Sequence, residues 1–255
     1  MRKKLQILLR EGASELGLEL DEGKEKAFEV YLKEIKKENK KVNLTSLTDN
    51  REIIIKHFLD SLSCAKACDF GVKLKVVDIG TGAGFPGLPL KIAYPEIELT
   101  LLDSSKKKTS FLSKTIECLN LKGISVVCCR AEDYGINSNN RGAFDLVLAR
   151  AVAPLSVLVE YALPLLKLGG LFIAQKSRGL DKEIGEGRMA AKAVGGQIEE
   201  AREVKVPFLE AKRYLVLVKK ISPSPKKYPR RPGIPAKRPL GKEFFVETKE
   251  RKREE

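Results

Sequence analysis

The sequence has little of the chemistry that metal-dependent and thiol-dependent enzymes use. Its 255 residues contain no tryptophan, one histidine and five cysteines. No two cysteines form a C-x-x-C pair, the usual spacing of zinc and redox sites. Cys128 and Cys129 are adjacent in an expected strand, so their side chains point to opposite faces. We therefore expect reduced, packed thiols at Cys64, Cys68, Cys118, Cys128 and Cys129, and no metal site.

Long apolar runs are also absent. The first ten residues are charged and amphipathic and lack the apolar centre of a signal peptide. No apolar run approaches the roughly 18 residues that a membrane-crossing helix needs. Together with the reduced thiols, these absences predict a cytoplasmic protein without a membrane partner.

Acidic residues are the minority among the charges. The chain carries 34 Asp and Glu against 48 Lys and Arg, which gives a formal net charge of +14. Such a surplus favours a polyanionic partner, and a lysine-rich surface kept for solubility is the alternative. Hydrophobic residues make up 43% of the chain, which is enough for a sizeable core.

The order of the apolar patterns predicts the fold class. Residues 1–70 have a helical pattern, in which Phe28, Tyr31, Leu32 and Ile35 repeat at helical spacing. From about residue 73, short apolar runs typical of strands buried on both faces alternate with helical segments. The expected strands are 74–79, 97–102, 124–129, 144–149 and 171–174, and the expected helices are 87–93, 106–121, 154–167 and 180–194. This alternation predicts right-handed crossovers and a parallel sheet.

Two further runs complete the expected domain. The segments 197–206 and 213–220 are joined by a short link that contains Pro207. A hairpin of the two would place an antiparallel strand in an otherwise parallel sheet. We therefore expect a doubly wound, mostly parallel seven-stranded α/β domain at 71–220, with an N-terminal helical extension at 1–70.

The composition changes again after residue 220. Residues 221–255 hold six of the twelve prolines and eleven Lys or Arg against five acids. This composition predicts an extended basic tail rather than a core element. The apolar residues available to anchor it are Leu240, Phe244, Phe245 and Val246.

A glycine-rich turn follows the first expected strand. It begins at Asp78 and continues as Ile-Gly80-Thr-Gly82-Ala-Gly84-Phe85-Pro86-Gly87 into a helix. Glycine is needed where the backbone turns with positive φ or approaches a ligand closely. At the carboxyl end of the first strand of a doubly wound sheet, that ligand is usually a nucleotide.

Two cofactor classes fit this turn. Gly82, Gly84 and Gly87 satisfy the dinucleotide fingerprint, so an NAD(P) oxidoreductase is one interpretation. The carboxylate of Asp78, however, would repel a pyrophosphate and would suit a cationic amino-acid group. Pro86 and Pro89 also remove N–H donors from the helix start that would hold phosphate. These features favour S-adenosylmethionine, which has no phosphate.

The next strand ends also carry polar residues. Asp103 lies 23 residues after Gly80, where an acid accepts hydrogen bonds from ribose hydroxyls in either cofactor class. The third strand ends in Arg130-Ala131-Glu132-Asp133, where an adenine edge would lie, and the fourth ends at Arg150. Four such ends at one edge of a sheet favour a nucleoside site over ordinary polar loops.

Several further motifs occur in order along the chain. They are Asn43-Leu-Thr45, Lys56-His57-Phe58-Leu59-Asp60-Ser61-Leu62, Asp78 to Leu90, Leu102-Asp103-Ser-Ser-Lys-Lys-Lys108, Ala131-Glu132, Ala149-Arg150-Ala151 and Tyr228-Pro-Arg-Arg231-Pro-Gly-Ile-Pro235 with Pro239-Leu240. Together these motifs resemble one known family, the RsmG (GidB) methyltransferases of guanine N7 in 16S ribosomal RNA. The resemblance covers about residues 30–240, and residues 1–20 and 249–255 match nothing in the family.

The resemblance implies a Rossmann-like class I S-adenosylmethionine-dependent methyltransferase that acts on the small ribosomal subunit. The implied substrate is guanine 527 in the 530 loop of 16S rRNA. The residues implied to line or border the cofactor pocket are Gly80, Phe85, Ala131, Glu132 and Arg150, with Asp103 near the ribose and Asp78 and Gly82 in the loop.

The absent catalytic motifs agree with methylation at N7. Guanine N7 carries a free lone pair, so the reaction needs positioning and desolvation without a general base, and we expect no catalytic residue. No Asn/Asp-Pro-Pro-Tyr/Phe motif follows the fourth strand, and no Pro-Cys or Thr-Cys pair supplies a nucleophile. We expect His57 to have a structural or RNA-facing role. A carboxylate near the methylated, cationic base would help electrostatically.

The basic residues are the candidates for holding RNA, and an unpaired guanine in a loop is the expected target. These candidates are Lys36, Lys37, Lys40, Lys41, Lys106, Lys107, Lys108, Arg150, Lys176, Arg178, Lys226, Lys227, Arg230 and Arg231. The alternatives left open are an oxidoreductase, a methyltransferase of another RNA or a small molecule, and a ribosome-associated module that binds RNA without methyl transfer.

Overall fold

The protein is built around one sheet of seven strands. The computed structural model describes residues 3–177 and 180–241 of the chain. Within these ranges the strand order is β3-β2-β1-β4-β5-β7-β6. The strands are β1 Lys75–Ile79, β2 Glu98–Asp103, β3 Ile124–Cys128, β4 Phe144–Arg150, β5 Leu166–Lys176, β6 Gly196–Val204 and β7 Arg213–Lys220. The first five are parallel, and β7 runs antiparallel to both β5 and β6. The predicted doubly wound, mostly parallel sheet is confirmed.

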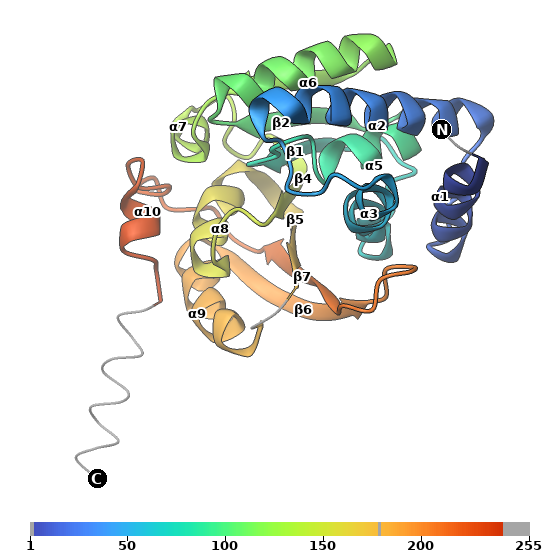
Figure 1. The fold of residues 1–255 in the computed structure, drawn as a ribbon. Coiled ribbons are helices and arrows are strands. Elements are labelled where there is room, and N and C mark those ends of the chain that lie inside the picture. The colour runs from blue at the N-terminus through green and yellow to red at the C-terminus, as the bar shows by residue number, and fades with distance from the viewer. Residues whose placement is uncertain (1–2, 178–179, 242–255) are drawn as a thin grey trace.

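Helices cover both faces of this sheet (Figure 1). Those of the central region are α5 Gly87–Ala93, α6 Lys106–Leu119, α7 Ala131–Ile136, α8 Leu155–Ala162 and α9 Leu180–Ala193. Neighbouring strand residues divide between two cores: Val76 packs with α5 and α6, whereas Val77 packs with α8 and α9. Because strand side chains alternate, a strand buried on both faces supplies both cores at once.

The N-terminal helices join the first of these cores. Two of them are α1 Lys3–Glu15 and α2 Glu22–Val42. Four short elements follow one another without a break: α3 Asn50–Ile53, the π-helix η1 Ile54–Leu59, α4 Asp60–Leu62 and the 3-10 helix η2 Ser63–Lys66. The apolar face predicted for α2 is buried, and Tyr31 stacks on Phe58 with ring centroids 5.3 Å apart. The Tyr31 hydroxyl donates to the carbonyl of Ala83, so α2 supports the glycine-rich loop directly.

Three local expectations are wrong. The helix expected at 154–167 ends at Ala162, and a 3-10 turn η3 Leu163–Leu165 leads straight into β5. Pro164 lacks an N–H, and its carbonyl accepts a bond from Gly142, so the chain leaves the helix there. The strand β3 is not buried on both faces, because it forms an edge of the sheet. Cys128 at the end of β3 is consequently exposed, Cys118 is exposed on α6, and Cys64 is the fully buried thiol.

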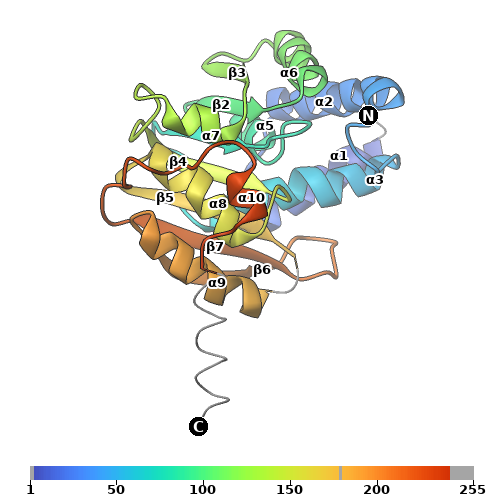
Figure 2. The same ribbon diagram turned by 90° about the vertical axis from the view of Figure 1, so that its left-hand side faces the viewer.

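Residues 221–241 do not form an extended tail. This segment turns back over α7 and α8 and ends in the short helix α10 Ile234–Lys237 (Figure 2). Tyr228 is 8% exposed and belongs to the second core, and Leu240 packs against the same core. The Arg141 guanidinium donates to the carbonyls of Ser224 and Tyr228. Phe244, Phe245 and Val246 lie outside the described residues, and the chain division at 70 and 220 stays a prediction.

None of the helices in the described part of the chain is both long and apolar enough to cross a membrane.

Candidate functional site

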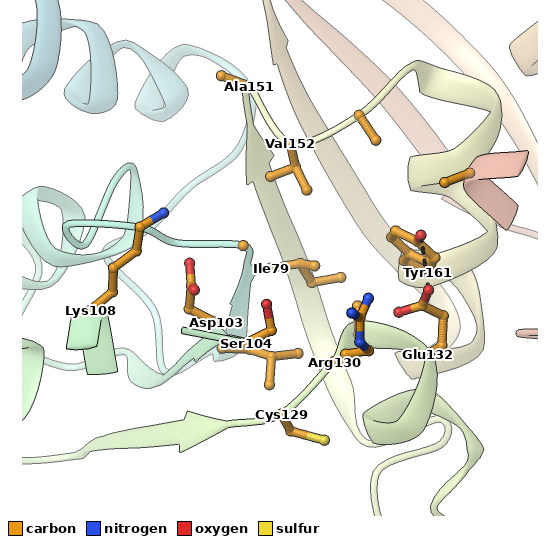
Figure 3. A pocket seen from close by; sticks show the side chains of 15 residues that line it. Ile79, Asp103, Ser104, Lys108, Cys129, Arg130, Glu132, Ala151, Val152 and Tyr161 are labelled. Atoms are coloured by element: carbon orange, nitrogen blue, oxygen red, sulfur yellow. Dashed lines mark hydrogen bonds between the residues drawn. The ribbon is translucent and has the colours of Figure 1, made fainter. Parts of the chain in front are cut away.

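A cavity of about 390 Å³ opens at the carboxyl ends of β1, β2 and β4, where the strand order reverses. This is the usual ligand crevice of a doubly wound sheet. Its lining residues include Ile79, Gly80, Asp103, Ser104, Lys108, Cys129, Arg130, Ala131, Glu132, Ala151, Val152, Tyr161 and Ala236 (Figure 3). Four of the residues implied for a cofactor pocket, namely Gly80, Asp103, Ala131 and Glu132, are therefore brought together.

The glycine-rich loop is organised by Asp78. Its Oδ2 accepts hydrogen bonds from the Thr81 hydroxyl at 2.6 Å and from the Gly87 N–H at 2.9 Å. Gly87 is the first residue of α5, so the N-terminus of this helix is directed at a protein carboxylate. A helix start used in this way does not offer the N–H cluster that a pyrophosphate requires. The geometry therefore favours the phosphate-free cofactor over the dinucleotide.

The other oxygen of Asp78 is unsatisfied. The residue has no exposed surface, and Oδ1 has no hydrogen-bond partner among the described residues. Burial raises the pKa of Asp78 to about 7, although the bonds from Thr81 and Gly87 and the charge of Arg150 oppose the shift. An orphaned carboxylate oxygen in a dry site is stabilised by a cationic ligand group.

Two further carboxylates border the cavity. Asp103 accepts from the Gly82 N–H at 2.9 Å and the Ser105 N–H at 2.8 Å, which fixes its side chain against the loop. Glu132 Oε1 accepts from the Gly233 N–H at 2.9 Å and from the Tyr161 hydroxyl at 3.2 Å. Figure 3 shows Asp103 and Glu132 on separate sides of the cavity. Each is placed to accept from a neutral ligand group such as a hydroxyl or an amino group.

Several residues that line the cavity were not predicted from the sequence, among them Val152, Tyr161 and Ala236. Val152 forms a wall over Gly80, and a Cβ at Gly80 would lie 2.6 Å from its Cγ2. Tyr161 comes from α8, and Ala236 comes from α10 of the C-terminal segment. The Pro-Gly-Ile-Pro run before Ala236 predicts a turn, but the neighbouring sequence does not indicate which part of the domain that turn packs against.

The loop needs a glycine most strictly at Gly84. Its φ is +104°, and a Cβ there would lie 2.7 Å from the Tyr31 hydroxyl. We expect Gly84→Ala to lower the free energy of unfolding by about 2–5 kcal/mol, through left-handed backbone strain and overpacking. Gly169 is the matched control, because its φ is +76° and nothing lies within 4 Å of its Cβ position. Urea unfolding of Gly84→Ala and Gly169→Ala checks this, and equal losses would show that the contact with Tyr31 is unimportant.

A second cavity of about 410 Å³ adjoins the first, and Ala151 lines both. Ala151 has a φ of +56°, a strained conformation for a residue with a side chain. The walls come from η1, α4, β4, β5, β7 and α9. They comprise Lys56, His57, Asp60, Arg150, Gln175, Lys176, Ser177, Glu183 and Arg213.

Arg150 lies in this second cavity and does not line the first. Its Nη1 donates to Asp60 Oδ2 at 3.1 Å and to the carbonyl of Lys56, and its Cζ lies 4.9 Å from the ring centroid of Phe85. Phe85 is 5% exposed and also stacks on His57, with centroids 4.5 Å apart. The structure thus places both Phe85 and Arg150 beside the first cavity rather than in it, while Asp78 and Gly82 support the loop from behind.

The single histidine is held between protein groups. His57 Nε2 lies 2.7 Å from the Thr45 hydroxyl, and Nδ1 lies 3.1 Å from the carbonyl of Lys56 and 3.3 Å from Arg150 Nη2. Burial, helped by the charge of Arg150, lowers the pKa of His57 to about 3. His57 is therefore neutral at physiological pH and supports the Arg150 side chain.

Besides Arg150, two of the basic residues expected to bind RNA are paired with carboxylates of the protein. Lys176 Nζ lies 2.9 Å from both the Ala153 carbonyl and Glu183 Oε2, and its side chain is 12% exposed. Arg230 makes a bidentate pair with Glu160, whose side chain has no exposed surface, at 2.7 Å. Arg231 is exposed, and Arg178 lies outside the described residues. The buried carboxylate of Glu160 holds the Arg230 guanidinium, and the expectation that Arg230 contacts RNA stays a prediction.

The described residues contain no group of three or more His, Cys, Asp or Glu side chains arranged to hold a metal ion.

Residues 24–216 match the family model described as GidB, rRNA small subunit methyltransferase G. Curated relatives named ribosomal RNA small subunit methyltransferase G agree with this match. The protein of Acetivibrio thermocellus is 46% identical over 238 residues, which cover 93% of this chain and 97% of that protein. The protein of Thermoanaerobacter pseudethanolicus is 45% identical over 240 residues, covering 94% and 100%.

Solved structures resemble this chain at the level of fold. A point mutant of MtNAS superposes with a TM-score of 0.52 at 15% identity, over 86% of each chain. The [4+2]-cyclase SpnF gives a TM-score of 0.50 at 14% identity, over 64% of this chain and 80% of that one. The doubly wound sheet with its antiparallel β7 is the fold of class I S-adenosylmethionine-dependent methyltransferases.

Proposed function

This chain belongs to the GidB family of small-subunit ribosomal RNA methyltransferases, and on this premise we propose that it methylates N7 of one guanine in small-subunit rRNA with S-adenosylmethionine. The target is guanine 527 in the 530 loop of 16S rRNA. The observation that carries the proposal is the pair of cavities that meet at Ala151. One is bordered by carboxylates at the nucleotide crevice, and the other combines cationic side chains, each paired with a carboxylate, with buried polar acceptors.

The residues of the first cavity fit S-adenosylmethionine. This cofactor supplies an electrophilic methyl group on a positively charged sulfonium, and its amino-acid part carries an ammonium group beside a carboxylate. Asp78 lies behind the glycine-rich loop rather than in the cavity wall, and its unsatisfied Oδ1 suits such a positive charge. Asp103 and Glu132 offer acceptors for ribose hydroxyls and an adenine amino group. At about 390 Å³ the cavity is within the usual range for a bound cofactor.

The protein supplies positioning rather than a base. Guanine N7 needs no deprotonation, and both ring nitrogens of His57 are occupied by protein groups. The chain's contribution is to hold the acceptor base next to the methyl group and to exclude water. Lys176 contacts both Glu183 and the Ala153 carbonyl, and these contacts hold the wall between the two cavities in place.

Cofactor affinity should depend on the charge of Asp78. Since its pKa is about 7 in the free protein, the carboxylate is ionised above that pH and protonated below it. We expect S-adenosylmethionine to bind about tenfold more weakly at pH 6 than at pH 8. His57, with a pKa of about 3, does not titrate in this range. Calorimetric titration across pH 6–8 measures the dependence, which Asp78→Asn should abolish; a flat wild-type profile would contradict this role.

Methyl incorporation tests the function itself. S-adenosylmethionine with a radiolabelled methyl group is offered with 30S subunits and, separately, with deproteinised 16S rRNA. We expect label in the RNA of one or both substrates. Label in neither small-subunit substrate would overturn the proposal. Binding of S-adenosylhomocysteine, compared with binding of reduced nicotinamide cofactor, distinguishes a methyltransferase from an oxidoreductase.

A further inference from the structure

The second cavity contains a buried acceptor that the protein itself leaves unused. Gln175 is 4% exposed and lines this cavity from β5. Its Nε2 donates to the Asp60 carbonyl at 2.7 Å, and this bond identifies which atom of the amide is the nitrogen and which is the oxygen. Gln175 Oε1 has no hydrogen-bond partner among the described residues. A buried oxygen without a partner costs free energy, so it indicates a ligand with an N–H or O–H donor.

A carboxylate and a guanidinium share the cavity with this amide. Glu183 of α9 is 29% exposed at its side chain and is held by Lys176 at 2.9 Å. Arg150 is the last residue of β4 and comes directly before Ala151, which lines both cavities. The contacts with Asp60 and the stack on Phe85 hold its guanidinium in place. The cavity thus combines a fixed cation near the junction with two acceptors.

This donor and acceptor set distinguishes the two purines. Adenine and guanine both carry a nucleophilic N7, so the choice between them depends on other atoms. Next to N7, guanine has the acceptor O6 and adenine has the donor N6–H₂. On the opposite edge, guanine has the donors N1–H and N2–H₂, where adenine has an acceptor at N1. A cation near N7 and acceptors opposite it therefore favour guanine at both edges.

We propose that the second cavity receives the target base and that Arg150, Gln175 and Glu183 select guanine. The inference rests on the proposed function. With N7 directed at the first cavity, O6 meets Arg150, and the N1–H and N2–H₂ groups meet Gln175 Oε1 and Glu183. Entry of the base requires that it be unstacked and turned out of the RNA, as in other enzymes that act on bases. Adenine would direct its N1 acceptor at one of the two protein acceptors and a C2–H at the other, and its amino group would face the guanidinium.

Base substitution at the target position tests the selection. Three versions of 16S rRNA are prepared by ligation, with guanine, inosine or adenosine at that position. Each is offered as free RNA and after reconstitution into subunits. Inosine keeps N7, O6 and N1–H and lacks only the N2 amino group. For the wild-type enzyme we expect kcat/KM to fall about 10–100-fold with inosine, the size of one hydrogen bond to a charged group. With adenosine we expect a loss of about 1,000-fold or more.

Two variants and one control assign the effect to the cavity. The kcat/KM on guanine should fall in both Glu183→Ala and Gln175→Leu. In Glu183→Ala the ratio of kcat/KM on guanine to kcat/KM on inosine should also drop to about 3 or less, because the partner of N2–H₂ is gone. Glu186→Gln lies on the same helix α9 and does not line the cavity, so its ratio should equal that of the wild type. Cofactor affinity, measured for each variant, shows that the fold is intact.

The possible failures are distinguishable. If the wild type methylates guanine and inosine equally, or if Glu183→Ala keeps the wild-type ratio, the selection is overturned and the methyltransferase function stands. If the wild type methylates no version of the RNA, the proposed function fails. A cavity that held an RNA phosphate instead would give the same ratio in all variants and a changed salt dependence.

Discussion

Asp78→Ala is expected to weaken the binding of S-adenosylmethionine by about 100-fold or more. The change removes the one buried carboxylate oxygen of the glycine-rich loop that has no partner among the described residues, and a charged contact in a dry site is worth about 1.5–3 kcal/mol. It also removes the acceptor that Thr81 and Gly87 share, so the glycine-rich loop loses its fixed shape. Isothermal titration at pH 8 measures the loss, and binding within about threefold of the wild type would contradict the assignment.

The same substitution should leave the protein folded. Because burial raises the pKa of Asp78 from its ordinary value to about 7, its ionised form is unfavourable in the folded state. This cost is absent below about pH 4 and is fully present above pH 7. At pH 8 its removal offsets the hydrogen bonds lost by Thr81 and Gly87. Asp145→Ala is the matched control, because Asp145 bonds the N–H of Lys75 at the opposite end of β1, away from the cavity, and should leave cofactor affinity unchanged.

Arg230→Met is expected to lower the free energy of unfolding by about 3–5 kcal/mol, the usual cost of leaving a buried charge without its partner. The partner is Glu160, which has no exposed surface and accepts from the backbone N–H, Nε and Nη2 of Arg230. For a chain of this size the loss corresponds to a melting temperature lower by about 6–20 °C. Differential scanning calorimetry measures it, and Arg231→Met, at an exposed neighbour, should shift the melting temperature little.

A double variant distinguishes the effect of the Arg230–Glu160 ion pair from other effects on the C-terminal segment. Replacing both partners, as Arg230→Met with Glu160→Leu, removes the unpaired charge and should restore much of the lost stability. The single variant should also weaken cofactor binding, because the segment after Arg230 supplies the Gly233 N–H to Glu132 and Ala236 to the cavity wall. A single variant as stable as the wild type would mean that the C-terminal segment is not held by this pair.

The central α/β pattern was predictable because its signals are local. The helix at 87–93 has the predicted bounds, because the glycines before it and Tyr94-Pro95 after it mark both ends. Asp78 was identified from its position before Gly80, and the structure gives it the expected contacts within the loop. The strand expected at 171–174 misses the first half of β5, because Leu166 to Gly170 are largely exposed and lack an apolar run.

The remaining parts of the cavity walls were not predictable from the sequence, because they depend on long-range contacts. Arg230 and Glu160 are 70 residues apart, and nothing near either one indicates a buried pair. The basic and proline-rich composition of 221–255 predicts exposure, yet Tyr228 and the Arg141 contacts bury residues 221–241 against the domain. Val152 and Ala236 are ordinary apolar residues whose role arises only from where the chain packs.

Chemical mapping of the transferred methyl group tests the function most directly. Small-subunit rRNA that has been methylated by this enzyme is cleaved at N7-methylguanine, and the cleavage site is read along the strand. We expect one cleavage, at guanine 527 in the 530 loop, that disappears with Asp78→Ala. A methyl group at another atom or another nucleotide, or no methyl transfer to this RNA, would contradict the function proposed for the two cavities.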